Sequence, residues 1–541
     1  MGRCYHIKFA VAVVVLAAVV IPVRAGGLDL DSLLTKSVGG ETAVERLRDV
    51  STIELTGRLL LNGQPGRFEI YVMMPDKMYF GIDFGSFSLA QAYDGQTAWQ
   101  RDHNGSIGVL SGFEERELVS QTYLATYSYI LDGGLPGSVE FLGKEEIDGT
   151  TNYKVAFMPL DEDTIFAYFD SATGLLERTV GYMDNLETVS LTDDYRTVEG
   201  VIISAHSLSS GTGAPLTSEL FADNIAFDTE IDPGIFSPPA GTVQDFRFPE
   251  GADSVVIPFE YERGHIYVTV VVNGHARLRL ILDSGASANI FHLPAIDALN
   301  LEKVGTVAAK GLSGYEEVQL VRTDSMAVGA LTMYNQVAGA MGAQGLGRDK
   351  DEIPFGGILG YDFLSRFPLL VNFEAGTITV YNPAAFAPAE GGAEVPFHMT
   401  MQIPTIEAEL NGIKGNFIID LGNAFGVILH RDFYEKNGLD KRLDNFEKLP
   451  QSLRGVGGGL SGQSAYAASF GFGDVRVNSL RVMIPESSEG VTGSSELAGN
   501  IGNLLLQQFT VLFDYPSQRL IFYDRSPEVE NREMQDLKES N

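Results

Sequence analysis

Cysteine and basic residues are scarce in this chain of 541 residues. The single cysteine is Cys4, so the chain cannot form an internal disulfide and offers no thiol chemistry beyond its first residues. The chain carries 38 Lys and Arg against 71 Asp and Glu, a formal net charge of −33. This negative charge argues against nucleic acids and anionic membrane surfaces as partners.

Several catalytic and metal-binding patterns are also missing from the sequence. There is no His-Glu-x-x-His pair, no paired cysteine and no Asp-rich calcium loop, which argues against a metal hydrolase. There is no Gly-x-Ser-x-Gly elbow for a serine nucleophile and no P-loop for nucleotide phosphates. The sequence therefore predicts no metal and no cofactor.

Only the start of the chain has an extended apolar run. Two basic residues precede the run Phe9–Val20, and Val23-x-Ala25 follows it, which is typical of a secretory signal peptide. The run is short for a membrane span, and an uncleaved anchor is the alternative. Removal of three basic residues with the signal would bring the net charge to −36. Export without disulfides favours the bacterial periplasm or the extracellular space.

One stretch places a carboxylate directly after a buried strand. The apolar run Leu278–Leu282 leads into Asp283-Ser-Gly, and Asn273-Gly274 upstream predicts a hairpin before it. An Asp at the end of a buried strand is costly unless other groups hold it. The structural interpretation is an Asx-turn that closes a hairpin, and the functional one is a catalytic carboxylate.

The same arrangement occurs a second time. Asn411-Gly412 predicts a hairpin eight residues before Asp420, and residues 499–523 align without a gap on residues 357–381. Such self-similarity predicts an internal duplication, here two β lobes that each offer one aspartate.

Three motifs of the first copy occur in the order found in a known family. Asp283-Ser-Gly-Ala follows a hairpin, Gly357-Ile-Leu-Gly-Tyr-Asp-Phe-Leu364 comes later, and the strands Leu369–Phe373 and Thr377–Tyr381 close the segment. The segment resembles the lobe of retropepsin-like aspartic peptidases. The resemblance implies catalytic Asp283 and Asp420, supporting-loop Ser284, Gly285 and Gly422, and a flap with Gly314 and Tyr315.

The second copy departs from the family pattern, because Leu421 stands where the family has a hydroxyl residue. That hydroxyl normally bonds across the lobe interface, and Asn423 is the candidate substitute. One alternative is therefore a non-catalytic protein that binds peptides or lipids; another is a homodimer in which lobe one pairs with itself. His292 and His430 follow the two aspartates at equivalent positions and are interpreted as packed or surface groups.

Two aspartates are sufficient for peptide hydrolysis by water. Two carboxylates about 3 Å apart cannot both ionise, so they share one proton. The ionised carboxylate acts as general base and the neutral one as general acid. Because they titrate as a pair, neither role is assigned to Asp283 or Asp420. The predicted function is an aspartic-type endopeptidase that acts on a peptide or protein substrate, as a monomer.

The first half of the chain has different patterns. A helix is expected over residues 41–50 and another over Phe113–Leu131, among alternating runs typical of antiparallel strands. Tyr93-Asp-Gly-x-x-x-Trp99 and Asp170-x-x-x-Gly174 resemble the outer-membrane lipoprotein carrier family. That family implies a curved antiparallel sheet over helices, with an apolar cavity for an acyl chain or hydrophobic ligand. An accessory domain that positions the catalytic part is the alternative.

The predicted fold class is mainly β, with two tandem retropepsin-like acid-protease lobes after an α+β curved antiparallel sheet, or half-barrel. The expected segments are a signal peptide (1–25), the sheet domain (26–240), a linker (241–253), lobe 1 (254–382), a linker (383–392), lobe 2 (393–524) and a polar tail (525–541).

Overall fold

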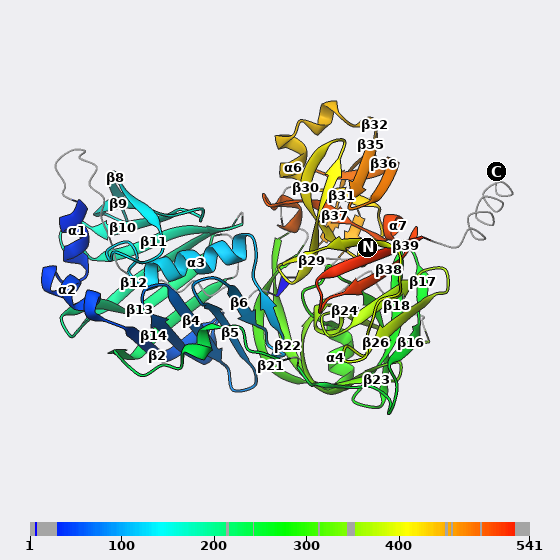
Figure 1. The fold of residues 1–541 in the computed structure, drawn as a ribbon, viewed down its shortest axis with the longest axis horizontal. Coiled ribbons are helices and arrows are strands. Elements are labelled where there is room, and N and C mark those ends of the chain that lie inside the picture. The colour runs from blue at the N-terminus through cyan, green and yellow to red at the C-terminus, as the bar shows by residue number, and fades with distance from the viewer. Residues whose placement is uncertain are drawn as a thin grey trace. The chain divides into compact units, whose positions relative to one another are not determined.

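The structure is a computed structural model. It describes residues 6–7, 30–184, 186–212, 216–241, 243–311, 314–342, 352–449, 453–455, 458–486 and 490–524. The chain divides into two compact units (Figure 1). The N-terminal unit contains residues 9–242 and 306–308, and the C-terminal unit contains residues 1–8, 243–305 and 309–541. The predicted tail 525–541 lies outside the described residues, as does the predicted signal peptide apart from His6–Ile7.

The N-terminal unit is built on one antiparallel sheet of 13 strands. Its strands are, in spatial order, β7 (Ile107–Val109), β6 (Ala98–Arg101), β5 (Ser88–Tyr93), β4 (Lys77–Asp83), β3 (Gln64–Met73), β2 (Thr52–Leu61), β14 (Thr217–Phe227), β13 (Val201–Gly211), β12 (Leu186–Val198), β11 (Leu176–Met183), β10 (Ile165–Asp170), β9 (Thr150–Pro159) and β8 (Gly137–Ile147).

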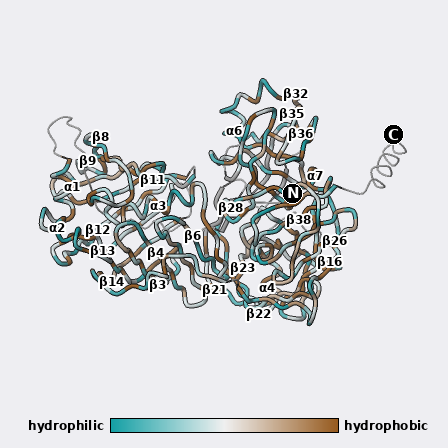
Figure 2. The backbone as a smooth tube through the Cα atoms, viewed as in Figure 1, coloured by the Kyte–Doolittle hydropathy of each residue, from teal (hydrophilic) through white to brown (hydrophobic). Residues whose placement is uncertain are grey.

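One face of this sheet is buried against helices. Alternate residues of β13 are buried from Val201 to Gly211, as expected for a strand with one face toward a core. Hydrophobic and hydrophilic residues alternate along many strands in the same way (Figure 2). The helices are α1 (Leu30–Ser37), α2 (Glu41–Asp49) and α3 (Phe113–Ala125), and a 3-10 turn spans Pro233–Phe236. Trp99 is buried and donates to the Phe236 carbonyl at 2.6 Å.

Helix α3 is shorter than the sequence predicts. The prediction extended it to Leu131, but the helix ends at Ala125 and Tyr127 adopts a φ of 55°. The hydroxyls of Thr122 and Thr126 each donate to the carbonyl four residues earlier, a pattern that weakens and bends helices. A left-handed Tyr127 then stops the helix.

The C-terminal unit contains two β lobes. The sheet of lobe 1 runs in the order β1 (His6–Ile7), β21 (Glu302–Gly311), β22 (Gly314–Val328), β18 (His265–Val272), β19 (Ala276–Leu282), β24 (Phe355–Leu359), β20 (Ile290–His292), β23 (Leu331–Met341) and β15 (Phe246–Arg247), with β17 (Glu260–Glu262) beside β18. Its helices are α4 (Leu293–Leu299) and α5 (Tyr361–Leu364).

The sheet of lobe 2 runs β28 (His398–Thr400), β29 (Ile403–Leu410), β30 (Ile413–Ile419), β37 (Leu497–Ile501), β31 (Val427–Leu429), β36 (Val475–Pro485), β35 (Gly462–Phe472) and β32 (Asp444–Lys448). A separate hairpin joins β33 (Leu453–Gly455) to β34 (Gly458–Leu460). The helices are α6 (Arg431–Lys436) and α7 (Asn503–Leu506), with 3-10 turns at Leu439–Lys441 and Gly490–Gly493.

The two lobes pair their central strands in the same way. In lobe 1, β19 runs parallel to β24, which is antiparallel to β20. In lobe 2, β30 runs parallel to β37, which is antiparallel to β31. Each lobe thus brings the end of a hairpin strand against a strand from much later in the chain.

A third sheet contains strands from both lobes. Its order is β16 (Ser254–Pro258), β26 (Thr377–Tyr381), β25 (Pro368–Asn372), β38 (Phe509–Asp514), β39 (Arg519–Asp524) and β27 (Ala393–Pro396). The lobes join where β25 pairs with β38, from Pro368 opposite Asp514 to Asn372 opposite Thr510. One buried hydrophobic cluster continues through both lobes. A single chain therefore holds the two lobes together.

The predicted fold class is confirmed: the protein is mainly β, with a large antiparallel sheet before two tandem β lobes. In the part of the chain described, no helix is long and apolar enough to cross a membrane.

Candidate active site

Each lobe presents one buried aspartate at the end of its hairpin strand. Asp283 follows β19, its N–H donates to the Leu359 carbonyl at 3.0 Å, and its carboxylate accepts the N–H of Gly285 at 2.8 Å. Asp420 follows β30 and repeats this pattern with Ile501 at 2.9 Å and Gly422 at 3.0 Å. Both side chains are at most 1% exposed. The carboxylate of Asp283 therefore forms the Asx-turn of the structural interpretation, and Asp420 forms one too. Neither turn closes a hairpin, because β24 lies between β19 and β20, and β37 lies between β30 and β31.

The two loops also touch each other, which a turn alone does not require. The Ser284 hydroxyl donates to the Ile419 carbonyl at 2.7 Å and accepts the N–H of Leu421 at 2.9 Å. A Cβ on Gly422 would lie 2.3–2.4 Å from the three carboxyl atoms of Asp283. The carboxylate of Asp283 thus lies directly against Gly422, whose N–H holds the carboxylate of Asp420.

The structure therefore brings together five of the seven residues predicted for the site: Asp283, Ser284, Gly285, Asp420 and Gly422. The predicted flap residues remain a prediction. Gly314 is the first residue of β22, and the side chain of Tyr315 lies outside the described residues.

A different asparagine from the predicted one compensates for Leu421. The Asn423 side chain stays in its own lobe, where its carbonyl accepts the N–H of Phe425 at 2.8 Å. Asn503, at the start of α7, donates to the Leu421 carbonyl at 2.5 Å and, across the lobe interface, to the Gly264 carbonyl at 2.8 Å. Asn503 was missed because it lies 82 residues from Leu421, although it stands where lobe 1 has Tyr361.

Replacement of Asn503 by Leu is expected to weaken the lobe interface. The variant keeps a similar volume but removes both donors from a fully buried site, which should lower the free energy of unfolding by about 1–3 kcal/mol. Urea denaturation monitored by circular dichroism would measure this change in the free energy of unfolding. Gln508→Met, which removes an exposed amide close to the same helix, is the control. Equal midpoints for the two variants would contradict the role given to Asn503.

Tyr515 is a buried tyrosine close to Asp283. Burial, then the neighbouring Tyr361 and Asp283, raise the pKa of Tyr515 well above its usual value. The rings of Tyr361 and Tyr515 are 6.3 Å apart. Tyr515 therefore stays neutral throughout the pH range in which carboxyl groups titrate, and it adds no charge to the site.

The two histidines at equivalent positions differ in their surroundings. His292 precedes α4, and burial lowers its pKa below the usual value. His430 precedes α6, is fully buried and bonds to Asn500, which in turn bonds to Asp420. The interpretation of His430 as a packed group is correct, but the sequence did not link it to the aspartate. Asn500 was missed for the same reason as Asn503.

No three or more His, Cys, Asp or Glu side chains gather in a metal-binding arrangement within the described ranges. The site as described consists of carboxylates, backbone N–H groups, a hydroxyl and amides. These groups suit acid–base chemistry on a bound water.

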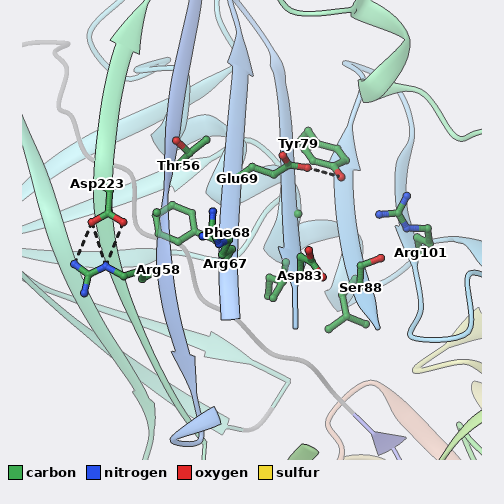
Figure 3. A pocket seen from close by; sticks show the side chains of 14 residues that line it. Thr56, Arg58, Arg67, Phe68, Glu69, Tyr79, Asp83, Ser88, Arg101 and Asp223 are labelled. Carbon is green, nitrogen blue, oxygen red and sulfur yellow. Dashed lines mark hydrogen bonds and ion pairs between the residues drawn. The ribbon is translucent and has the colours of Figure 1, made fainter. Parts of the chain in front are cut away.

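The N-terminal unit has a cavity of about 660 Å³ on β2–β6 and β14 (Figure 3). Arg58 forms an ion pair with Asp223 at 3.0 Å, and Glu69 accepts from Tyr79 at 3.4 Å. Burial, then Glu69, raises the pKa of Tyr79. The remaining charged groups of the lining are Arg67, Asp83 and Arg101. The lining thus carries charges of both signs beside apolar side chains, and the predicted hydrophobic ligand stays a prediction.

Part of lobe 1 matches a known protein family. Residues 268–363, in lobe 1, match the family described as aspartyl protease. The predicted resemblance is confirmed there, and the lobe has an aspartic protease fold. No curated protein matches the chain.

Solved structures resemble separate parts of the chain. A retropepsin-like aspartic protease from Rickettsia conorii is 17% identical, with a TM-score of 0.19, over 25% of this chain and 91% of its own. Basic 7S globulin from soybean is 11% identical, with a TM-score of 0.30, over 51% of this chain and 98% of its own. A LolA superfamily protein from Nitrosomonas europaea is 12% identical, with a TM-score of 0.28, over 37% of this chain and 97% of its own.

Proposed function

We propose that this protein is an exported aspartic-type endopeptidase that hydrolyses peptide bonds with water activated by Asp283 and Asp420. The observation that carries the proposal is the contact between the two loops. Gly422 touches the carboxylate of Asp283 and donates its N–H to that of Asp420, so both carboxyl groups flank one residue. Two buried carboxyl groups this close share a proton and so supply one base and one acid.

The surroundings of the pair support this chemistry. Ser284 bonds to two backbone groups of the opposite loop, which restricts the motion of one aspartate relative to the other. Pre-positioned groups of this kind lower the barrier because little reorganisation is needed during the reaction. The cross-lobe bond of Asn503 offsets the missing hydroxyl at Leu421, which was the main argument for a non-catalytic protein.

The proposed catalyst is a monomer. Both aspartates come from one chain, and the sheet that joins the lobes is completed within that chain by β25 and β38. A homodimer built from two copies of lobe 1 would have to break this pairing. The proposed substrate is a peptide or protein, and the proposed location, from the predicted signal peptide, is the periplasm or the extracellular space.

The test is cleavage of a mixed-peptide library by the full-length chain at pH 3–8. We expect cleavage that a statine-containing peptide inhibits, because its hydroxyl mimics the tetrahedral intermediate, and that a chelator leaves unchanged. A folded protein that cleaves nothing at any pH, or whose activity disappears with the chelator alone, would refute the proposal. Binding of peptides without cleavage would indicate the alternative function.

A further inference from the structure

Asp420 is connected to a buried chain of two polar side chains. The Asn500 amide nitrogen donates to Asp420 Oδ2 at 3.2 Å, and the Asn500 carbonyl oxygen lies 2.7 Å from Nε2 of His430. Asn500 is 1% exposed and His430 is fully buried. Asp420 therefore accepts two N–H groups, one on each oxygen, from Asn500 and Gly422.

The equivalent position in lobe 1 is apolar. Asn500 pairs with Ile418 and Ile428 in the sheet of lobe 2, and Ile358 pairs with Ile281 and Ile290 in the sheet of lobe 1. The two residues thus occupy the same place beside their respective aspartates. Ile358 has no N–H in its side chain to offer Asp283, so the two members of the dyad have chemically different surroundings.

The orientation of the Asn500 amide follows from its two partners. Its carbonyl oxygen can only accept, so Nε2 of His430 carries the proton that it donates. The NH₂ group then faces Asp420, so Oδ2 of Asp420 accepts from Asn500 and cannot donate a proton to it. Hydrogen bonds donated to a carboxylate favour its charged form, most strongly where water is excluded.

Resting on the proposed function, we propose that Asn500, oriented by His430, keeps Asp420 ionised and so leaves the shared proton of the dyad on Asp283. Asn500 and His430 are positioning residues. Asp420 is then the general base and Asp283 the general acid in the first step of hydrolysis.

The proton balance of the reaction follows from this assignment. In the first step water gives a proton to Asp420, and the water oxygen forms a bond to the carbonyl carbon of the peptide. At the same time Asp283 gives its proton to the carbonyl oxygen. In the second step one hydroxyl of the resulting gem-diol returns a proton to Asp283, Asp420 protonates the leaving nitrogen, and the C–N bond breaks. The starting protonation is restored without another reactant.

Other titratable groups surround the dyad in the described part of the chain. Asp283 faces Asp420 from the opposite loop, and His430 donates to Asn500 whether its ring is neutral or charged. Tyr515 and Tyr361 lie on the side of Asp283. Asp362, at the start of α5, is buried and accepts the N–H of Asn289 at 2.6 Å.

The test replaces Asn500 by Ile, the residue of lobe 1, with Ile358→Val as the control. We expect the acidic limb of the kcat/KM profile to move up by about one pH unit in Asn500→Ile, the shift that matches one lost hydrogen bond to a carboxylate. The profile of Ile358→Val should coincide with that of the wild type. His430→Phe keeps Asn500 but loses its orientation, and should give a smaller shift in the same direction.

A second measurement does not depend on turnover. Calorimetric titration with a statine-containing peptide, in buffers of different ionisation enthalpy, reports proton uptake by the dyad at each pH. The pH at which uptake changes should shift upward in Asn500→Ile. Cleavage with superimposed profiles for all variants would overturn the inference and leave the proposed function standing. If the pH of proton uptake shifts in Asn500→Ile but the protein cleaves no peptide, the inference stands and the proposed function is overturned.

Discussion

Asp283→Asn and Asp420→Asn are each expected to lower kcat/KM by about 10³-fold or more. General acid–base catalysis contributes about 10²–10⁴-fold, and each change removes one of the two carboxyl groups that carry it. An amide can neither take the proton from water nor share one with its neighbour. The fold should be retained, because Asn has nearly the same shape as Asp. The replacement also removes a group that could carry a buried charge.

The measurement is kcat/KM on the best peptide of the library, across pH 3–8, for the wild type and both variants. Asp297→Asn, an exposed position on α4 in the same lobe, is the matched control and should be as active as the wild type. Loss of activity in Asp283→Asn alone would contradict the two-lobe dyad and favour the homodimer of lobe 1. Full activity in both variants would exclude the aspartates as catalysts.

The hairpins before both aspartates could be predicted because their signals are local. Asn273 and Gly274 have φ values of 49° and 74°, and Asn411 and Gly412 have 49° and 82°, as a type I′ turn requires. In both copies the strand after the turn has seven residues and the aspartate follows it directly. The lobe-sized repeat could be read because the segment from β24 to β26 (residues 357–381) aligns without a gap on the segment from β37 to β39 (residues 499–523).

The groups that hold the dyad could not be predicted in this way. Asn500 and Asn503 lie some 80 residues from the loop of Asp420 and reach it only through the parallel pairing of β30 with β37. A signal did exist, because the gapless alignment places these two asparagines opposite Ile358 and Tyr361. Polar residues at the buried positions of a repeat indicate a bond that the other copy does not make.

Gly422→Ala is expected to lower kcat/KM by at least about 10²-fold with a smaller effect on folding. The added methyl carbon would lie 2.3 Å from Oδ2 and 2.4 Å from Oδ1 of Asp283, well inside van der Waals contact. The carboxylate must move away from its partner, and displacement of a catalytic group by about 1 Å can cost about 10²-fold in rate. Overpacking of this kind typically costs about 1–3 kcal/mol of stability.

The expected loss of activity in Gly422→Ala comes from a steric clash and not from backbone strain. Gly422 is not among the glycines with positive φ, so an alanine can adopt its backbone conformation and only the contact with Asp283 is disturbed. Gly342→Ala is the matched control, because a Cβ there would meet no atom within 4 Å. Gly342→Ala should leave the free energy of unfolding nearly unchanged and Gly422→Ala should lower it by about 1–3 kcal/mol, while only Gly422→Ala loses activity and affinity for the statine-containing peptide. An active Gly422→Ala would show that the two carboxyl groups need not be as close as this contact makes them.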